Sequence, residues 1–157
     1  MQFPPQITTF LASIIPGLDV KIAVPLGLQL GLSPFSAIFF GSAGTILLSA
    51  IILAIIEPVT NWARQHSKYI NAFFEKIFNQ TRKDHSKNFA RYGAAFIIMF
   101  VAVPIPGSGG FTAAIIAFLF KVDYWKALTL IIIGVLISSS LIVGGISSFI
   151  GMRNLFT

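Results

Sequence analysis

Two ionisable residues stand inside long apolar segments of this sequence: Asp19 and Lys21. A charge at the centre of a bilayer costs roughly 2.5–3.5 kcal/mol on insertion scales, so such residues point to a function or to mutual pairing. The carboxylate could carry a proton or a cation, and the ammonium could hold an anionic group or act as its counter-ion. A structural ion pair, or a location at the membrane edge, is the alternative. On a regular helix two residues at this spacing face different ways, so only a break lets both reach one cavity.

The sequence contains two such breaks. The first is at Pro16-Gly17, and the second runs from Pro104 to Thr112 as Pro-Ile-Pro-Gly-Ser-Gly-Gly-Phe-Thr. Proline lacks a backbone donor, and glycine permits backbone angles that helices do not use. The glycine-rich stretch 107–110 can present successive N–H groups as a nest for an anion or a polar head group, with Thr112 opening the next half-helix. A turn without a ligand is an equally open alternative.

If the two breaks meet, Asp19 and Lys21 of the first break lie opposite the glycine nest and Ser108 of the second break. This prediction makes the two breaks the halves of one site for a substrate or an ion. The predicted binding residues are Pro16, Gly17, Asp19, Lys21, Pro106, Gly107, Ser108, Gly109, Gly110 and Thr112.

The residues that most enzymes need are missing from this sequence. It has no cysteine, no Gly-x-Ser-x-Gly motif and no histidine in an apolar segment, since His66 and His85 both lie in a basic stretch. It also has no cluster with metal-ligand spacing. We therefore expect a protein that is not an enzyme and that uses neither a cofactor nor a metal.

Composition indicates an integral membrane protein. Hydrophobic residues make up 55% of the 157 residues and charged residues only 10%, whereas soluble domains carry roughly 25% charged residues. The apolar segments must be helical, because lipid cannot satisfy bare backbone groups. The net charge of +6 is concentrated in residues 57–91, which indicates membrane orientation and contact with anionic lipid rather than nucleic acid.

The chain divides into two broken segments and two uninterrupted spans within a single membrane domain, 1–157. The broken segments are 6–31 and 92–120, and the spans are 35–56 and 127–150. Glu57-Pro58 is expected to end the first span and to open a basic amphipathic linker, 57–91, in the membrane interface. The first span has a small residue at every fourth position: Ala37, Gly41, Thr45 and Ser49. Such a face lets another helix approach closely, so we expect a homodimer or higher oligomer.

The two halves align without a gap at an offset of 90, which places Pro16-Gly17 on Pro106-Gly107. Repeat 1 is then 6–56 and repeat 2 is 92–150. If the broken segments are re-entrant hairpins, the second repeat is inverted relative to the first. If they cross the membrane, the chain has four spans and the two repeats are parallel. Hairpins put nine of the 11 Lys and Arg residues on one side, so the positive-inside rule favours hairpins and a cytoplasmic linker. The predicted fold is an all-α membrane protein of two inverted repeats, each a re-entrant hairpin plus one transmembrane helix.

Both breaks resemble signatures of one family. The stretch Asp19-Val-Lys-Ile-Ala-Val-Pro-Leu-Gly27 is similar to Glu-x-Arg-Gly-Ala-Ile-Pro-x-Gly of the small multidrug export protein family. The stretch Pro104-Ile-Pro-Gly-Ser-Gly-Gly-Phe-Thr-Ala113 is similar to its second signature, Pro-x-Pro-Gly-Thr-Gly-Ala-Trp-Thr-Gly. Here Asp and Lys replace Glu and Arg, which keeps the sign of each charge but loses the guanidinium fork. The order of motif, span, basic linker, motif and span also matches that family.

The resemblance implies a membrane exporter, distantly related to the DedA membrane proteins with their re-entrant hairpins and proton-coupled lipid-carrier or phospholipid transport. We expect a transporter of a small amphiphile or a lipid-linked anion, with protons as the candidate coupling ion. Its partners would be membrane lipids, its substrate and further copies of itself in the cell membrane. A structural or assembly subunit of a membrane complex is the alternative. Matched helix breaks and an intramembrane charge pair favour transport over that alternative.

Overall fold

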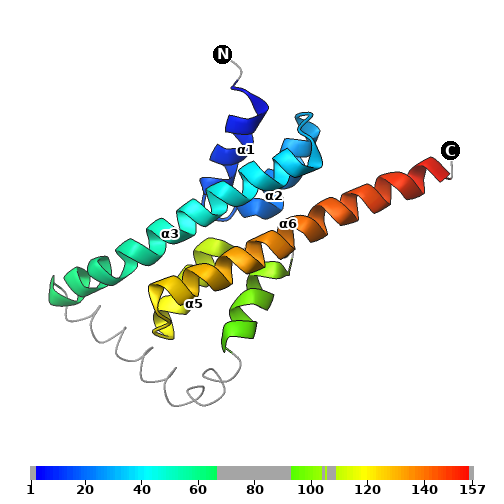
Figure 1. Cartoon of the computed structure of the whole chain (residues 1–157). Helices are drawn as coiled ribbons and strands as arrows, with labels where there is room; N and C mark the ends of the chain where they lie inside the picture. Colours follow the sequence, from blue (N-terminus) through cyan, green and yellow to red (C-terminus); the bar gives the residue numbers. More distant parts are fainter. Residues whose placement is uncertain (1–2, 67–92, 104, 106–108, 156–157) are drawn as a thin grey trace.

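The computed structural model describes residues 3–66, 93–103, 105 and 109–155, and every regular element in these ranges is an α-helix (Figure 1). The described helices are α1 (Pro5–Ile14), α2 (Asp19–Gln29), α3 (Pro34–His66), an unlabelled helix (Gly93–Ala102), α5 (Gly110–Leu119) and α6 (Tyr124–Leu155). The expected all-helical fold class is therefore confirmed.

Two of the described helices, α3 and α6, are long and apolar enough to cross a membrane. The qualifying stretches are Pro34–Trp62, with 29 residues, and Tyr124–Ser148, with 25 residues; at about 1.5 Å per residue both exceed a hydrocarbon core of roughly 30 Å. Their outer surfaces carry large apolar side chains, such as Phe35 at 79% exposed and Trp125 at 77%. These features fit a membrane protein whose apolar surface faces lipid.

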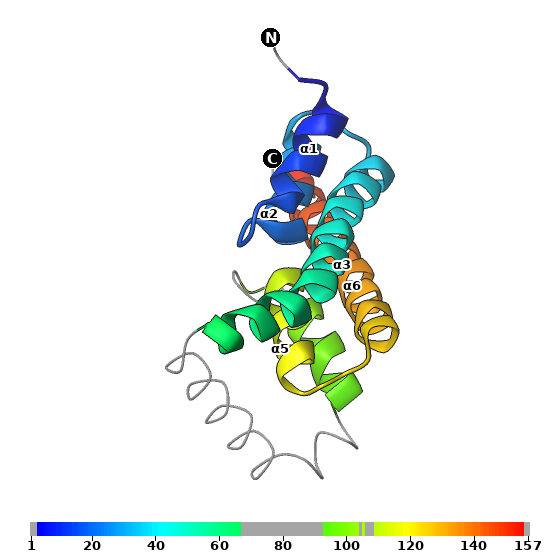
Figure 2. The ribbon, with the colours of Figure 1, turned by 90° about the vertical axis from the view of Figure 1, so that its left-hand side faces the viewer.

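Helices α3 and α6 run in opposite directions and cross near the centre of the molecule (Figures 1 and 2). Ser42 on α3 and Ser139 on α6 are buried there, and their hydroxyl oxygens lie 2.8 Å apart. A buried hydroxyl pair gives two packed helices a directional contact in addition to their apolar packing. Ser139 therefore serves the packing of α6 against α3.

The expectation that Glu57-Pro58 ends the first span is wrong. Helix α3 passes through Pro58 and continues to His66. Proline removes only the hydrogen bond to the carbonyl four residues earlier, and the exposed apolar side chains of Ile55, Val59 and Trp62 continue on helical spacing across it. The rest of the predicted linker, 67–91, lies outside the described residues.

The two broken segments each fold back on themselves at the predicted break. Helix α1 runs toward the centre of the molecule and α2 returns (Figure 1). Helix Gly93–Ala102 and α5 do the same from the opposite end of the long helices (Figure 2). We call residues 15–18 the first tip, and the described residues Val103, Ile105 and Gly109 the second tip. The start of α5 lies close to the start of α2, beside the crossing of α3 and α6 (Figures 1 and 2).

Helices α2 and α5 end in the same way, 90 residues apart. The N–H of Leu32 donates to the Gly27 carbonyl at 3.0 Å, and the N–H of Val122 donates to the Ala117 carbonyl at 2.9 Å. The turn residue in each is left-handed, with φ +88° at Gly31 and +54° at Lys121. These hydrogen bonds use carbonyls that each helix would otherwise leave without a partner at its end.

Small residues bring the helices into close contact. Three alanines of α5, Ala113, Ala114 and Ala117, are buried, and a Cβ at Gly41 on α3 would lie 2.9 Å from the Val24 side chain of α2. The small-residue face of α3 at 37–49 is thus covered by helices of the same chain. The sequence-based reason for placing a homodimer contact on that face is wrong, because the close approach that the face permits is intramolecular.

Candidate functional site

Asp19 begins α2 with a left-handed backbone, φ +49°. Aspartate tolerates this conformation better than most residues, and it is uncommon enough to mark a special position. The residue is 8% exposed. Its Oδ1 accepts hydrogen bonds from the Val20 N–H and from Thr45 Oγ1, the latter at 3.2 Å. The carboxylate is therefore buried and held by donors from two helices.

Lys21 forms an ion pair with Asp19 from within α2. Its Nζ lies 3.5 Å from Asp19 Oδ2, and neither side chain is more than 10% exposed. The positive φ of Asp19 turns its carboxylate out of the regular helical direction, which lets residues two apart meet. The predicted charge pair therefore exists, with both partners buried.

Gly109, at the second tip, lies directly against the Asp19 carboxylate. A Cβ at Gly109 would sit 2.6 Å from Asp19 Cγ, closer than real atoms approach. Its backbone, φ −90° and ψ −176°, is open to any residue. Gly109 is thus needed for the space it leaves, and the sequence-based reason, an unusual backbone angle, does not apply here.

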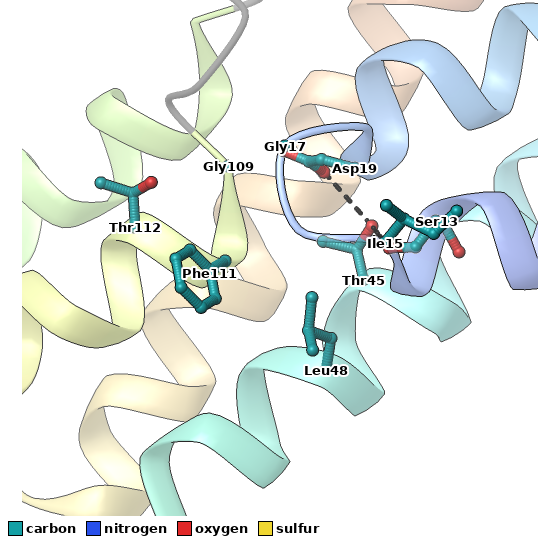
Figure 3. A pocket seen from close by; sticks show the side chains of 9 residues that line it. All are labelled: Ser13, Ile15, Gly17, Asp19, Thr45, Leu48, Gly109, Phe111 and Thr112. Carbon is teal, nitrogen blue, oxygen red and sulfur yellow. Dashed lines mark hydrogen bonds between the residues drawn. The ribbon is translucent and has the colours of Figure 1, made fainter. Parts of the chain in front are cut away.

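A small cavity lies between the two tips (Figure 3). Its volume is about 20 Å³, which is room for roughly one water molecule. Figure 3 shows Phe111 and Leu48 projecting into the space opposite the hydrogen-bonded pair Asp19 and Thr45. The lining residues are Ser13, Ile15, Gly17, Asp19, Thr45, Leu48, Gly109, Phe111 and Thr112.

Three helix ends converge on this cavity. Helix α1 ends at Ile14, whereas α2 and α5 begin at Asp19 and Gly110. Carbonyl groups at the end of α1 give a partial negative charge, and N–H groups at the starts of α2 and α5 give partial positive charges. Broken helices whose ends meet at one point are the geometry that binds ions and polar substrates inside membranes.

Of the residues predicted for the site, the structure brings Gly17, Asp19, Gly109 and Thr112 together around the cavity. Lys21 is not among the described residues that line the cavity, but it forms an ion pair with Asp19, which does line it. Pro16 is exposed on the outside of the first tip. The predicted residues Pro106, Gly107 and Ser108 lie outside the described part of the chain.

The predicted start of the second half-helix, at Thr112, lies two residues too late. Helix α5 begins at Gly110 and not at Thr112, so Gly110 belongs to the first helical turn. A Cβ there would lie 3.1 Å from the Thr45 side chain and would overlap Ser49 Oγ. Gly110 therefore serves the packing of α5 against α3.

Sequence reasoning missed five cavity residues: Ser13, Ile15, Thr45, Leu48 and Phe111. Thr45 is the most important of these residues. Its hydroxyl donates to Asp19 Oδ1 and also lies 3.4 Å from the Ser13 carbonyl oxygen. A signal was available, since Thr45 and Ser49 are polar residues one turn apart in a span without charge. Buried hydroxyls need acceptors, and the intramembrane carboxylate was the obvious one.

A second, wholly apolar groove lies between α1 and α3. Its volume is about 300 Å³, the lower end of the range for pockets that bind drug-sized molecules. Ser13, which lines the polar cavity, donates to the carbonyl of Phe10 in the groove wall at 2.8 Å. The groove is lined by Gln6, Ile7, Phe10, Phe39, Phe40 and Ala43.

Within the described ranges, no group of three or more His, Cys, Asp or Glu residues comes together in a way that could hold a metal ion. The residues around the cavity offer one carboxylate, hydroxyl groups and helix ends. Such groups can bind an ion, a proton or a polar head group.

Comparison with protein families gives a match over most of the chain. A family model described as "Putative small multi-drug export protein" matches residues 19–141, from Asp19 to the middle of α6. Neither curated proteins nor solved structures give a match. The family resemblance read from the two motifs is confirmed, and the description names export and not a chemical reaction. The chain belongs to the small multi-drug export protein family.

Proposed function

We propose that this protein exports a small amphiphile or a lipid-linked anion across the cell membrane, with protons as the coupling ion and the two tips as the substrate site. The observation that carries the proposal is the contact between Gly109 and the buried Asp19 carboxylate. It joins the two broken segments at the one buried acid that lines the cavity. Ionisable residues inside membrane helices default to function, and paired broken helices are typical of transporters.

The proposed topology consists of two re-entrant hairpins in inverted repeats. Three observations support it: the helix pairs fold back from opposite ends, α3 and α6 are antiparallel, and the ends of α2 and α5 correspond at an offset of 90. The chain would then be multi-pass, with the basic segment 57–91 on the cytoplasmic side by the positive-inside rule.

Substrate binding in this mechanism requires the tips to separate. The cavity of about 20 Å³ admits roughly one water molecule, so the described arrangement is a closed one. Gly17, with φ +93°, and Gly109 lie in the two tips, where a change of backbone angles moves a half-helix without unfolding it. The apolar part of an amphiphile would lie in the groove between α1 and α3, one helical turn from Ser13.

Lipid molecules or further copies of the chain would cover the exposed apolar surface. With two long helices, one chain has little protein to shield two hairpins from lipid, so the proposal includes a homo-oligomer. Measuring the mass of the protein in nanodiscs tests the proposed homo-oligomer. A monomer that transports substrate would contradict it.

The function is tested with purified protein in liposomes. A pH gradient should drive transport of an amphiphilic dye or a fluorescent short-chain lipid. Asp19→Asn should abolish this transport, whereas Asp123→Asn, at an exposed aspartate, should leave it intact. If no dye or lipid of either charge is transported, the exporter proposal fails and the structural-subunit alternative gains support.

A further inference from the structure

We propose that Ser138 belongs to a second pocket, equivalent to the described cavity but on the α6 side of the tips, in which its hydroxyl binds the polar head group of the substrate. The inference rests on the proposed export function and deepens it, because substrate would meet the two sides of the membrane through the two pockets in turn. The ligand class is an amphiphile whose head group donates or accepts a hydrogen bond.

The first observation is a buried hydroxyl without a partner. Ser138 is 0% exposed, and within the described part of the chain its Oγ is the one buried side-chain polar atom that makes no hydrogen bond. The next two serines differ from it, since Ser139 and Ser140 donate to carbonyls of their own helix at 2.6 Å and 2.8 Å. An unsatisfied buried hydroxyl is costly, and a ligand or a water molecule that binds it in another state explains why it is there.

Two glycines show that both long helices meet their broken segments in the same way. A Cβ at Gly44 on α3 would lie 2.6 Å from the Phe10 carbonyl oxygen of α1. A Cβ at Gly134 on α6 would lie 3.1 Å from the Ile98 carbonyl oxygen of the helix Gly93–Ala102. Because the two glycines are 90 residues apart, α6 crosses the arm of its own half at the place where α3 crosses α1.

Ser138 lies one helical turn beyond Gly134, on the same face of α6. Its counterpart on α3 is Leu48, since 138 − 48 = 90, and Leu48 lines the cavity between the tips (Figure 3). The equivalence therefore places Ser138 at the wall of a matching pocket on the other side of the tips. That pocket is closed in the described structure, because Ser138 has no exposed surface.

Each long helix offers one hydroxyl at this level of the molecule. Thr45 stands where α6 has Val135, and Ser138 stands where α3 has Leu48. In the described state Thr45 Oγ1 is satisfied, because it donates to Asp19 Oδ1 at 3.2 Å, whereas Ser138 Oγ is not. A movement that closes the cavity beside Thr45 and opens the α6 side would give the Ser138 hydroxyl its partner.

The first tip has the freedom that this movement needs. Gly17 in this tip has φ +93°, and a Cβ there would meet nothing within 4 Å, so no neighbour wedges the turn in place. Inverted repeats reach their two states by rocking of one repeat against the other around a fixed site. In the proposed inverted arrangement, two pockets that the repeat makes equivalent open to opposite sides of the membrane.

Thiol labelling tests for the second pocket. Because the natural sequence has no cysteine, Ser138→Cys and Leu48→Cys each carry a single thiol. The full-length protein, in liposomes of known orientation, is exposed to a membrane-impermeant methanethiosulfonate on one side at a time. The two thiols should react from opposite sides. Ser138→Cys should also react about tenfold or more faster than Ser139→Cys, the matched control, whose parent side chain is equally buried but bonds to Ser42.

Alanine variants test whether the hydroxyl binds substrate. Ser138→Ala should be at least as thermostable as the wild type, because it removes an unsatisfied group. Its KM for transport of a short-chain lipid carrying a nitrobenzoxadiazole fluorophore should rise about fivefold, the usual effect of one lost hydrogen bond. Ser139→Ala should do the reverse: it loses the contact with Ser42 and melts at a lower temperature, with an unchanged KM.

Three results would overturn the inference. One is a reaction of Ser138→Cys as slow as that of Ser139→Cys, and another is a reaction of both pocket thiols from the same side. The third is a lower stability of Ser138→Ala with an unchanged KM, which is what a hydroxyl that serves only packing would give. Transport by the wild type with any of these results would leave the exporter proposal standing. If no lipid or dye is transported, the exporter proposal fails, and the thiol labelling still decides whether the second pocket exists.

Discussion

Gly109 lies directly against the Asp19 carboxylate, and a Cβ at Gly109 would sit 2.6 Å from Asp19 Cγ. The two residues occupy equivalent places in the two halves, since 109 − 19 = 90. One half supplies an acid at this place and the other half supplies room for it. The contact therefore requires a difference between the halves, which a perfectly repeated sequence would not provide.

Gly109→Ala should destabilise the protein by about 1–3 kcal/mol, because the added methyl group overlaps a buried carboxylate. Thermal stability in detergent, followed by loss of the monodisperse peak, measures the effect. Gly144→Ala is the matched control, since a Cβ there meets nothing within 4 Å, and alanine in a helix should stabilise it by up to about 1 kcal/mol. Combining Gly109→Ala with Asp19→Ala should recover part of the loss; strict additivity would argue against the contact.

Thr45→Val should lower stability by about 1.5–3 kcal/mol, since it keeps the shape of the side chain but removes a hydrogen bond to a charged acceptor. Thr129→Val is the control, because Thr129 is exposed and its hydroxyl donates only to the Trp125 carbonyl of its own helix. That change should stay within about 0.5 kcal/mol. Equal effects of the two substitutions would mean that the hydroxyl of Thr45 does not hold Asp19.

Asp19→Asn should abolish transport driven by a pH gradient while the fold is retained. Asparagine matches the size of aspartate and can still accept from Thr45 Oγ1 and the Val20 N–H, but it cannot take up and release a proton. Transport in liposomes and circular dichroism of the same preparation measure the two parts. Normal gradient-driven transport by this variant would exclude Asp19 as the proton carrier.

Single cysteines at Leu32 and Val122 should be labelled from opposite sides of the membrane, with Val122 on the cytoplasmic side. The natural sequence contains no cysteine, so each introduced thiol is the only one. Both residues lie in the turns that follow α2 and α5. Labelling of both from the outside would instead establish four full spans and remove the re-entrant hairpins.

Much of the architecture follows from local chemistry and could be predicted from the sequence. Proline and glycine close together, as at 16–17 and 104–110, favour a helix break, because they change backbone hydrogen bonding and angles within a few residues. The apolar length of the spans, the membrane class and the family also depend on local composition and motifs. The end of α3 was the exception, since Pro58 weakens a helix without ending it.

The site itself was decided by tertiary structure. Whether Thr45 faces Asp19 or lipid depends on the rotation of α3 about its axis, which no local pattern specifies. The same rotation directs the small residues 37–49 toward α2 and α5 of the same chain. The sequence alone determined that an acid, a lysine and two breaks lie inside a membrane protein. Only packing between segments about 90 residues apart placed Gly109 against Asp19, because side-chain contact depends on helix orientation as well as on residue type.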